Sequence, residues 1–196
     1  MKLAIWRSGA AFVVTAIALT LFGCEKKAIP PRNAVADKPA KADPAIYLEQ
    51  GERVFFDDFE RAALGPSWTT KHPGWRIEDG VLREDNAKNA GLWLNQPLPE
   101  KVRVSFKIRS GSMPAGKPFP GDVKCEAFAT QQEHEAGYVF INGGWSNQLD
   151  VIARLDEHGT DRKEQPAAQV KADAWTQWQI VRVNKDIYWF RAGKLL

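Results

Sequence analysis

One stretch of the chain carries charged side chains at a spacing that could do chemistry. Between Gln148 and His158 polar and apolar residues alternate, which predicts a β-strand with two unlike faces. One face would belong to the core and carry Leu149, Val151, Ala153 and Leu155. The other would be an open, charged face made of Asp150, Ile152, Arg154, Asp156 and His158.

The spacing of the two aspartates on this face does not suit a glycosidase. Such enzymes place two carboxyl groups about 5 to 9.5 Å apart, whereas Asp150 and Asp156 would lie about 20 Å apart along a strand, with Arg154 between them. Asp156 and His158 are neighbours on the face and could form a general-base dyad, so they are the candidate catalytic residues. The alternative is an ion-pair ladder on a solvated face.

Trp145 is the best candidate for contact with a ligand. The sequence Gly143-Gly144-Trp145-Ser146-Asn147 separates two strand patterns and predicts a turn with the indole at its tip. An exposed indole can stack on the apolar face of a sugar ring; the alternative is a lid over one end of the fold. The predicted ligand-binding surface consists of Trp145, Asp150, Arg154, Asp156 and His158.

Metal ligands are sparse in this sequence. The three histidines, His72, His134 and His158, show no dense ligand spacing, so we expect no transition-metal site and no cofactor. The acidic pair Asp57 and Asp58 could hold a structural calcium ion. Cys125 alternates with apolar residues, which predicts a buried, unreactive thiol.

The first 23 residues are typical of a signal peptide. They have a basic start and an apolar run from Ala10 to Phe22 that is too short to span a bilayer comfortably; an uncleaved anchor helix is the alternative. The segment Leu21-Phe22-Gly23-Cys24 resembles the lipobox of bacterial lipoproteins, which implies cleavage before Cys24 and its acylation. Glu25, rather than aspartate, follows this cysteine, which favours the outer membrane in a source with two membranes.

Residues 24–45 contain four prolines and alternating charges, and they predict an extended tether. Without Lys2 and Arg7 of the leader, the chain has 25 basic and 24 acidic residues, interleaved along the sequence. This balance gives no reason to expect a nucleic-acid partner.

Residues 46–196 predict an all-β domain of about nine short strands without intervening helices, arranged as an antiparallel β-sandwich. Asp79-Gly80 is a two-residue hairpin signal. Residues 101–109 predict a strand with Val102, Val104, Phe106 and Ile108 inward and a wet opposite face. The strand at residues 186–191 is followed by a turn and only two residues of a return strand, so we expect the domain to be truncated at Leu196.

Three segments, residues 55–60, 75–82 and 104–109, resemble concanavalin A-like (laminin G, glucanase-type) jelly rolls. They are most similar to the bacterial branch that includes 3-keto-disaccharide hydrolase-like domains, over roughly residues 53 to 194. The resemblance implies a curved two-sheet sandwich whose concave face and rim loops handle glycans.

We therefore expect a lipid-anchored protein of the cell envelope with a lectin-like, glycan-binding β-sandwich. Its partners would be a carbohydrate and, through acylated Cys24, the lipid bilayer. The alternatives are a glycoside hydrolase-type enzyme acting on a disaccharide or polysaccharide, and a protein-interaction module of the envelope.

Overall fold

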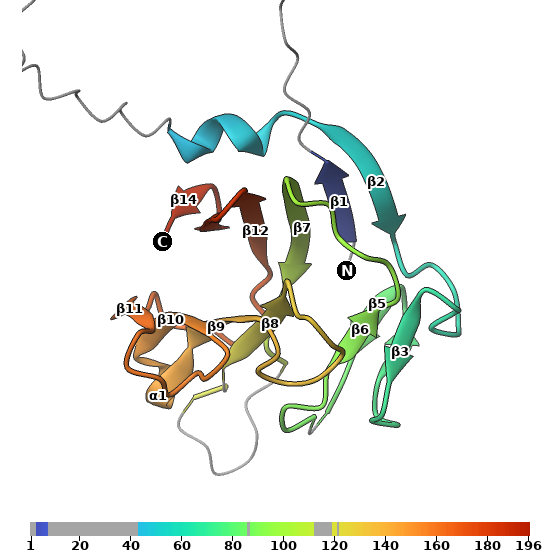
Figure 1. Cartoon of the computed structure of the whole chain (residues 1–196). Helices are drawn as coiled ribbons and strands as arrows, with labels where there is room; N and C mark the ends of the chain where they lie inside the picture. Colours follow the sequence, from blue (N-terminus) through green and yellow to red (C-terminus); the bar gives the residue numbers. More distant parts are fainter. Residues whose placement is uncertain (1–2, 8–42, 86, 112–118, 121) are drawn as a thin grey trace, which may run out of the picture.

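The computed structural model describes residues 3–7, 43–85, 87–111, 119–120 and 122–196 (Figure 1). Regular structure in these ranges is almost entirely β, in antiparallel sheets, as the sequence predicts. Cys24 and most of the predicted leader and tether lie outside the described residues. No helix in the described ranges is long and apolar enough to cross a membrane.

Two sheets make up most of the fold. The larger has six strands in the spatial order β14 (Lys194–Leu195), β13 (Asp186–Arg191), β12 (Thr176–Val183), β7 (Val102–Ile108), β1 (Leu3–Arg7) and β2 (Glu52–Asp57). The smaller has four, in the order β11 (Lys163–Pro166), β10 (Leu149–Arg154), β9 (Tyr138–Gly143) and β8 (Val123–Ala127).

Shorter elements complete the described chain. Two small hairpin-like sheets pair β3 (Trp68–Thr70) with β6 (Leu92–Leu94) and β4 (Arg76–Glu78) with β5 (Val81–Arg83). A 3-10 helix, η1 (Pro44–Leu48), precedes β2, and a single turn, α1 (Gly144–Asn147), joins β9 to β10.

The main core lies between the two large sheets. Trp178 and Trp189 of the six-stranded sheet are fully buried, with ring centroids 4.6 Å apart, and Phe140 of β9 meets Trp189 edge-on at 5.8 Å. Because both sheets contribute to one apolar cluster, the architecture is sandwich-like. The jelly-roll topology remains a prediction.

The two strongest local patterns are confirmed. Asp79 and Gly80 both have positive φ, 52° and 67°, as a two-residue hairpin turn between β4 and β5 requires. In β7, Val102, Val104 and Phe106 are buried in the main core.

The predicted wet face of β7 is only partly open, because Arg103 is buried on it. Helix η1 covers this arginine, whose Nη1 donates to the carbonyl oxygens of Tyr47, at 3.0 Å, and Leu48. Its guanidinium also lies 4.8 Å from the centre of the Trp6 ring. Burial lowers the pKa of Arg103 below its ordinary value.

Strand β1 was not anticipated as part of the sheet. It pairs with β2 on one side and β7 on the other, and Leu3 and Ile5 enter the main core. The sequence pattern predicts that these residues belong to a cleaved leader.

Candidate functional site

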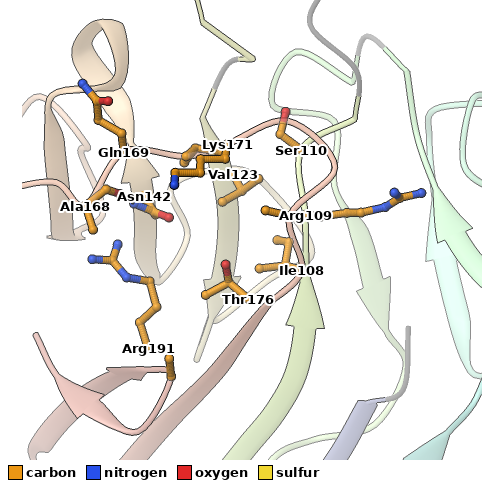
Figure 2. A pocket seen from close by; sticks show the side chains of 13 residues that line it. Ile108, Arg109, Ser110, Val123, Asn142, Ala168, Gln169, Lys171, Thr176 and Arg191 are labelled. Atoms are coloured by element: carbon orange, nitrogen blue, oxygen red, sulfur yellow. Dashed lines mark hydrogen bonds between the residues drawn. The ribbon is translucent and has the colours of Figure 1, made fainter.

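A pocket of about 190 Å³ lies where the two large sheets meet at one end (Figure 2). Strands β7, β12 and β13 form one side, and β8, β9 and the segment from Ala168 to Lys171 form the other. Its polar lining side chains come from several segments of the chain: Arg109, Ser110, Asn142, Gln169, Lys171, Thr176 and Arg191.

An ion pair joins the two sheets beside this pocket. Arg191, at the end of β13, reaches towards Asn142 and Ala168 (Figure 2), and its Nη1 lies 2.8 Å from Oδ2 of Asp150 on β10. The two side chains are only 12% and 1% exposed. Asn142 faces Asp150 across the β9–β10 ladder and donates from Nδ2 to its Oδ1 at 2.6 Å.

The two buried atoms interact as charges rather than through a well-directed hydrogen bond. Although Arg191 Nη1 and Asp150 Oδ2 are close, neither atom makes a well-directed hydrogen bond within the described part of the chain. Burying two charges costs free energy that their attraction often fails to recover, so apolar residues would serve stability as well.

The turn α1 holds the pocket wall in place. Asn147 accepts from the backbone N–H of Val170 at 2.8 Å and donates to its carbonyl oxygen at 3.0 Å. Gly143 has φ 78° and is packed so closely that a Cβ atom there would lie 2.6 Å from Val170 Cγ2. The positive φ and the close contact with Val170 therefore both require glycine at this position.

The pocket lining carries more positive than negative charge. Arg109 is paired with Asp173 at 3.1 Å and lies over the Trp175 ring, and Arg191 is paired with Asp150. Lys171 is exposed, and its ammonium has no ion-pair partner among the described residues. None of the residues found to line the pocket is acidic.

Trp145 lies on the other side of the four-stranded sheet from Asp150. Its ring packs against a second apolar cluster made of Val139, Ile141, Val151 and Ala153. The guanidinium of Arg162 lies 4.5 Å from the ring centre, and the His158 ring meets it edge-on at 5.5 Å. Its φ of 50° is unusual for a bulky residue. The Trp145 ring is therefore partly buried and covers the second apolar cluster like a lid.

The prediction of one open charged face from Asp150 to His158 is wrong. Strand β10 ends at Arg154, and Leu155, expected in the core, has φ 67° and is 46% exposed. Both faces of β10 are covered by apolar clusters: Val151 and Ala153 belong to the second cluster, and Ile152 packs against the main core. Asp150, on the same face as Ile152, therefore faces the six-stranded sheet and is buried. Arg154 is exposed at the strand end, 4.0 Å from Asp161.

The predicted dyad of Asp156 and His158 is not assembled in this structure. Asp156 Oδ1 accepts a hydrogen bond from the backbone N–H of His158 at 2.8 Å, which closes a turn. The His158 ring contacts Glu157 and Trp145 instead.

A carboxylate network lies beside the second cluster. His134 Nδ1 is 2.6 Å from Glu126 Oε1, and Lys124 Nζ is 2.5 Å from Glu157 Oε2. Glu135 connects them, since its N–H donates to Glu126 and its carboxylate accepts from the N–H of Glu157. These bonds fasten two loops to β8. Across the described ranges, no cluster of His, Cys, Asp or Glu could hold a metal ion.

The two residues considered for calcium have structural partners. Asp57 is buried and accepts from both Nη atoms of Arg61, from Trp68 Nε1 and from the N–H of Phe59, at 2.6 to 2.9 Å. Burial alone would raise the pKa of Asp57, but these hydrogen bonds outweigh it and hold the pKa below its ordinary value. Asp58 accepts from the N–H of Glu60. These contacts therefore do not support a calcium site at Asp57 and Asp58.

Cys125 is half-buried and packs against the main core. Burial, with a smaller effect of the Glu126 charge, raises the pKa of its thiol to about 12. A thiol with this pKa is not a nucleophile at neutral pH.

Comparisons with protein-family models, with curated proteins and with solved structures find no match to this chain. Its function is therefore inferred from the geometry of the site and from the sequence.

Proposed function

We propose that this chain is a lipid-anchored protein of the cell envelope that binds a glycan in the pocket between its two large sheets. The observation that carries the proposal is the polar lining of this pocket, which includes Arg191, the partner of the buried Asp150. Sugar hydroxyls both donate and accept, so they can bond to the guanidinium, amide and hydroxyl groups of this lining.

The size and charge of the pocket narrow the ligand. At about 190 Å³ it is smaller than the clefts of about 300 to 1,000 Å³ that bury drug-sized ligands, so it suits one sugar unit at the end of a glycan. The ammonium of Lys171, without an ion-pair partner in the described structure, favours a sugar that carries a carboxylate or another negative group.

Binding without hydrolysis fits this lining better than catalysis does. A glycosidase of the usual kind needs two carboxyl groups flanking the scissile bond. Asp150 contacts the lining from behind, and it is held there by Arg191 and Asn142. Export and lipidation rest on the leader pattern and on Cys24 in the sequence.

The test uses the full chain with Cys24→Ser, which prevents acylation. Thermal unfolding is measured alone and with neutral and acidic oligosaccharides, since a ligand of the folded state raises the midpoint. We expect an acidic sugar to raise the unfolding midpoint. Lys171→Ala should weaken the apparent affinity calculated from this shift about tenfold. Lys185→Ala, an exposed lysine in the β12–β13 turn, is the matched control. No shift with any acidic or neutral sugar would contradict the proposal.

A further inference from the structure

Asn142, near the end of β9, lies in the wall of the pocket and is only 4% exposed. Its side-chain Nδ2 donates two hydrogen bonds, one to Oδ1 of Asp150 at 2.6 Å and one to the carbonyl oxygen of Ala168 at 3.1 Å. An amide NH₂ group has two hydrogens to donate. Both are therefore used within the chain, and Nδ2 has none left for a ligand.

The two partners of Nδ2 fix the direction in which the Asn142 amide points. The backbone carbonyl oxygen of Ala168 only accepts hydrogen bonds, and so does the carboxylate of Asp150, which is paired with Arg191. If the amide were turned over, its own oxygen would face these two acceptors with no hydrogen between them. Asn142 Oδ1 is therefore held on the opposite side of the amide group.

This oxygen is an acceptor that the described part of the chain leaves unused. Asn142 Oδ1 accepts no hydrogen bond from any described residue, and it is not among the buried polar atoms that are closed to solvent and unpaired. Figure 2 shows it on the side of Asn142 that is turned away from Ala168. A donor group of a ligand in the pocket can therefore reach it.

Asn142 supplies what the charged groups of the lining lack. Arg109, Lys171 and Arg191 are all donors and cannot accept a hydrogen bond. A sugar hydroxyl that donates to Asn142 Oδ1 keeps its own oxygen free to accept from one of these cations. A ligand group that only accepts, such as a carboxylate, would meet Oδ1 with a like partial charge.

We propose that Asn142 is the specificity-determining residue of this pocket, and that its fixed carbonyl oxygen selects a sugar that presents a hydroxyl group there as the donor. Asp150 is then a positioning residue, because it holds the amide, and Arg191 balances its charge. This role rests on the proposed function and deepens it. The negative group of an acidic sugar lies away from Asn142, where a cation of the lining can pair with it.

The orientation of the amide is tested first, in the isotope-labelled chain with Cys24→Ser and without sugar. Triple-resonance spectra assign the side-chain amide signals. We expect the two hydrogens of Asn142 to exchange with water about 100-fold more slowly than those of Asn184, an exposed asparagine in the β12–β13 turn. Exchange as fast as at Asn184 would overturn the inference, because the amide would then be free to turn.

The selection is tested with the acidic oligosaccharide that raises the unfolding midpoint most. Its analogues each carry fluorine in place of one hydroxyl of the terminal sugar, which preserves the size of the group but removes the donor. We expect one analogue to bind about 30-fold more weakly, because Asn142 Oδ1 is left without a donor. In Asn142→Ser, whose hydroxyl can rotate and donate, the same analogue should lose no more than about threefold. Asn184→Ser, the matched control, should keep the full loss.

The outcomes separate the selection from the proposed function. Fluorinated analogues that all bind as tightly as the parent sugar would overturn the inference and leave the proposed function intact. A full loss retained in Asn142→Ser would also overturn it, because another group would then be the acceptor. If no sugar shifts the midpoint, the proposed function fails and the role of Asn142 fails with it. Urea unfolding checks that Asn142→Ser is folded; if it is not, the exchange rates and the analogue series on the starting chain decide.

Discussion

Replacing Arg191 by methionine removes the cation from the buried pair and preserves most of the side-chain volume. Asp150, 1% exposed, would keep only the hydrogen bond from Asn142. Breaking a buried pair on one side costs about 3 to 5 kcal/mol, and because Arg191 is 12% exposed we expect the lower end, about 3 kcal/mol. Asp150→Asn should cost a similar amount, since it leaves the guanidinium buried without its counter-charge.

The double variant with Asp150→Asn and Arg191→Met should behave differently. Neither charge remains to be desolvated, so its free energy of unfolding should be within about 1 kcal/mol of the starting chain. Urea unfolding measures all four proteins. With a slope of about 2 kcal/mol/M, the single variants should unfold at about 1.5 M less urea and the double variant at nearly the same concentration.

Two results would refute this reasoning. Single variants that lose less than about 1 kcal/mol would show that water screens the pair, as at an exposed site. A double variant that loses the sum of the two single costs would show that each residue stabilises the fold independently. If the expected result holds, stability does not require the pair, and the double variant becomes a folded protein with an altered pocket.

Three further predictions concern other parts of the chain. Asp57→Asn should lower the free energy of unfolding by about 2 kcal/mol at pH 7, measured in urea. Because the folded-state pKa of Asp57 is lowered, this advantage of the wild type should be complete above about pH 4 and disappear as the pH falls through the folded pKa. Cys125, with a pKa of about 12, should not react with a thiol reagent at pH 8 until the chain is unfolded. Trp145→Ala should cost about 2 kcal/mol through lost packing and leave glycan affinity within about twofold, because the ring lies across the sheet from Asp150.

Each of these has a clear contrary result. An Asp57→Asn chain as stable as the wild type at pH 7 would show that the arginine and tryptophan contacts contribute nothing. Rapid labelling of folded Cys125 would mean that the thiol is accessible. Loss of glycan binding in an otherwise stable Trp145→Ala chain would place the ligand on the outer face of the four-stranded sheet.

Local patterns predicted the elements of the fold whose structure depends on near neighbours. The Asp79-Gly80 turn follows from backbone preferences of two residues, and the inward face of β7 follows from its alternation. The all-β, sandwich-like architecture was predictable because many short strand patterns occur without helical ones.

The candidate site was harder to predict because it depends on contacts between distant residues. Alternation in β10 separates two faces, but it does not tell which face meets the other sheet, and here apolar clusters lie on both. The pairing of Asp150 with Arg191 joins two sheets and has no signature in the sequence. The positive φ of Leu155, which ends the alternation, also has no local signal in a leucine.

The most direct test of the central claim is a calorimetric titration of the Cys24→Ser chain with the acidic oligosaccharide that raises its unfolding midpoint most. We expect one binding site in this chain, and loss of that binding in the folded double variant with Asp150→Asn and Arg191→Met. Equal affinity of the two proteins for the sugar would contradict it, because recognition would then not involve the buried pair beside the pocket.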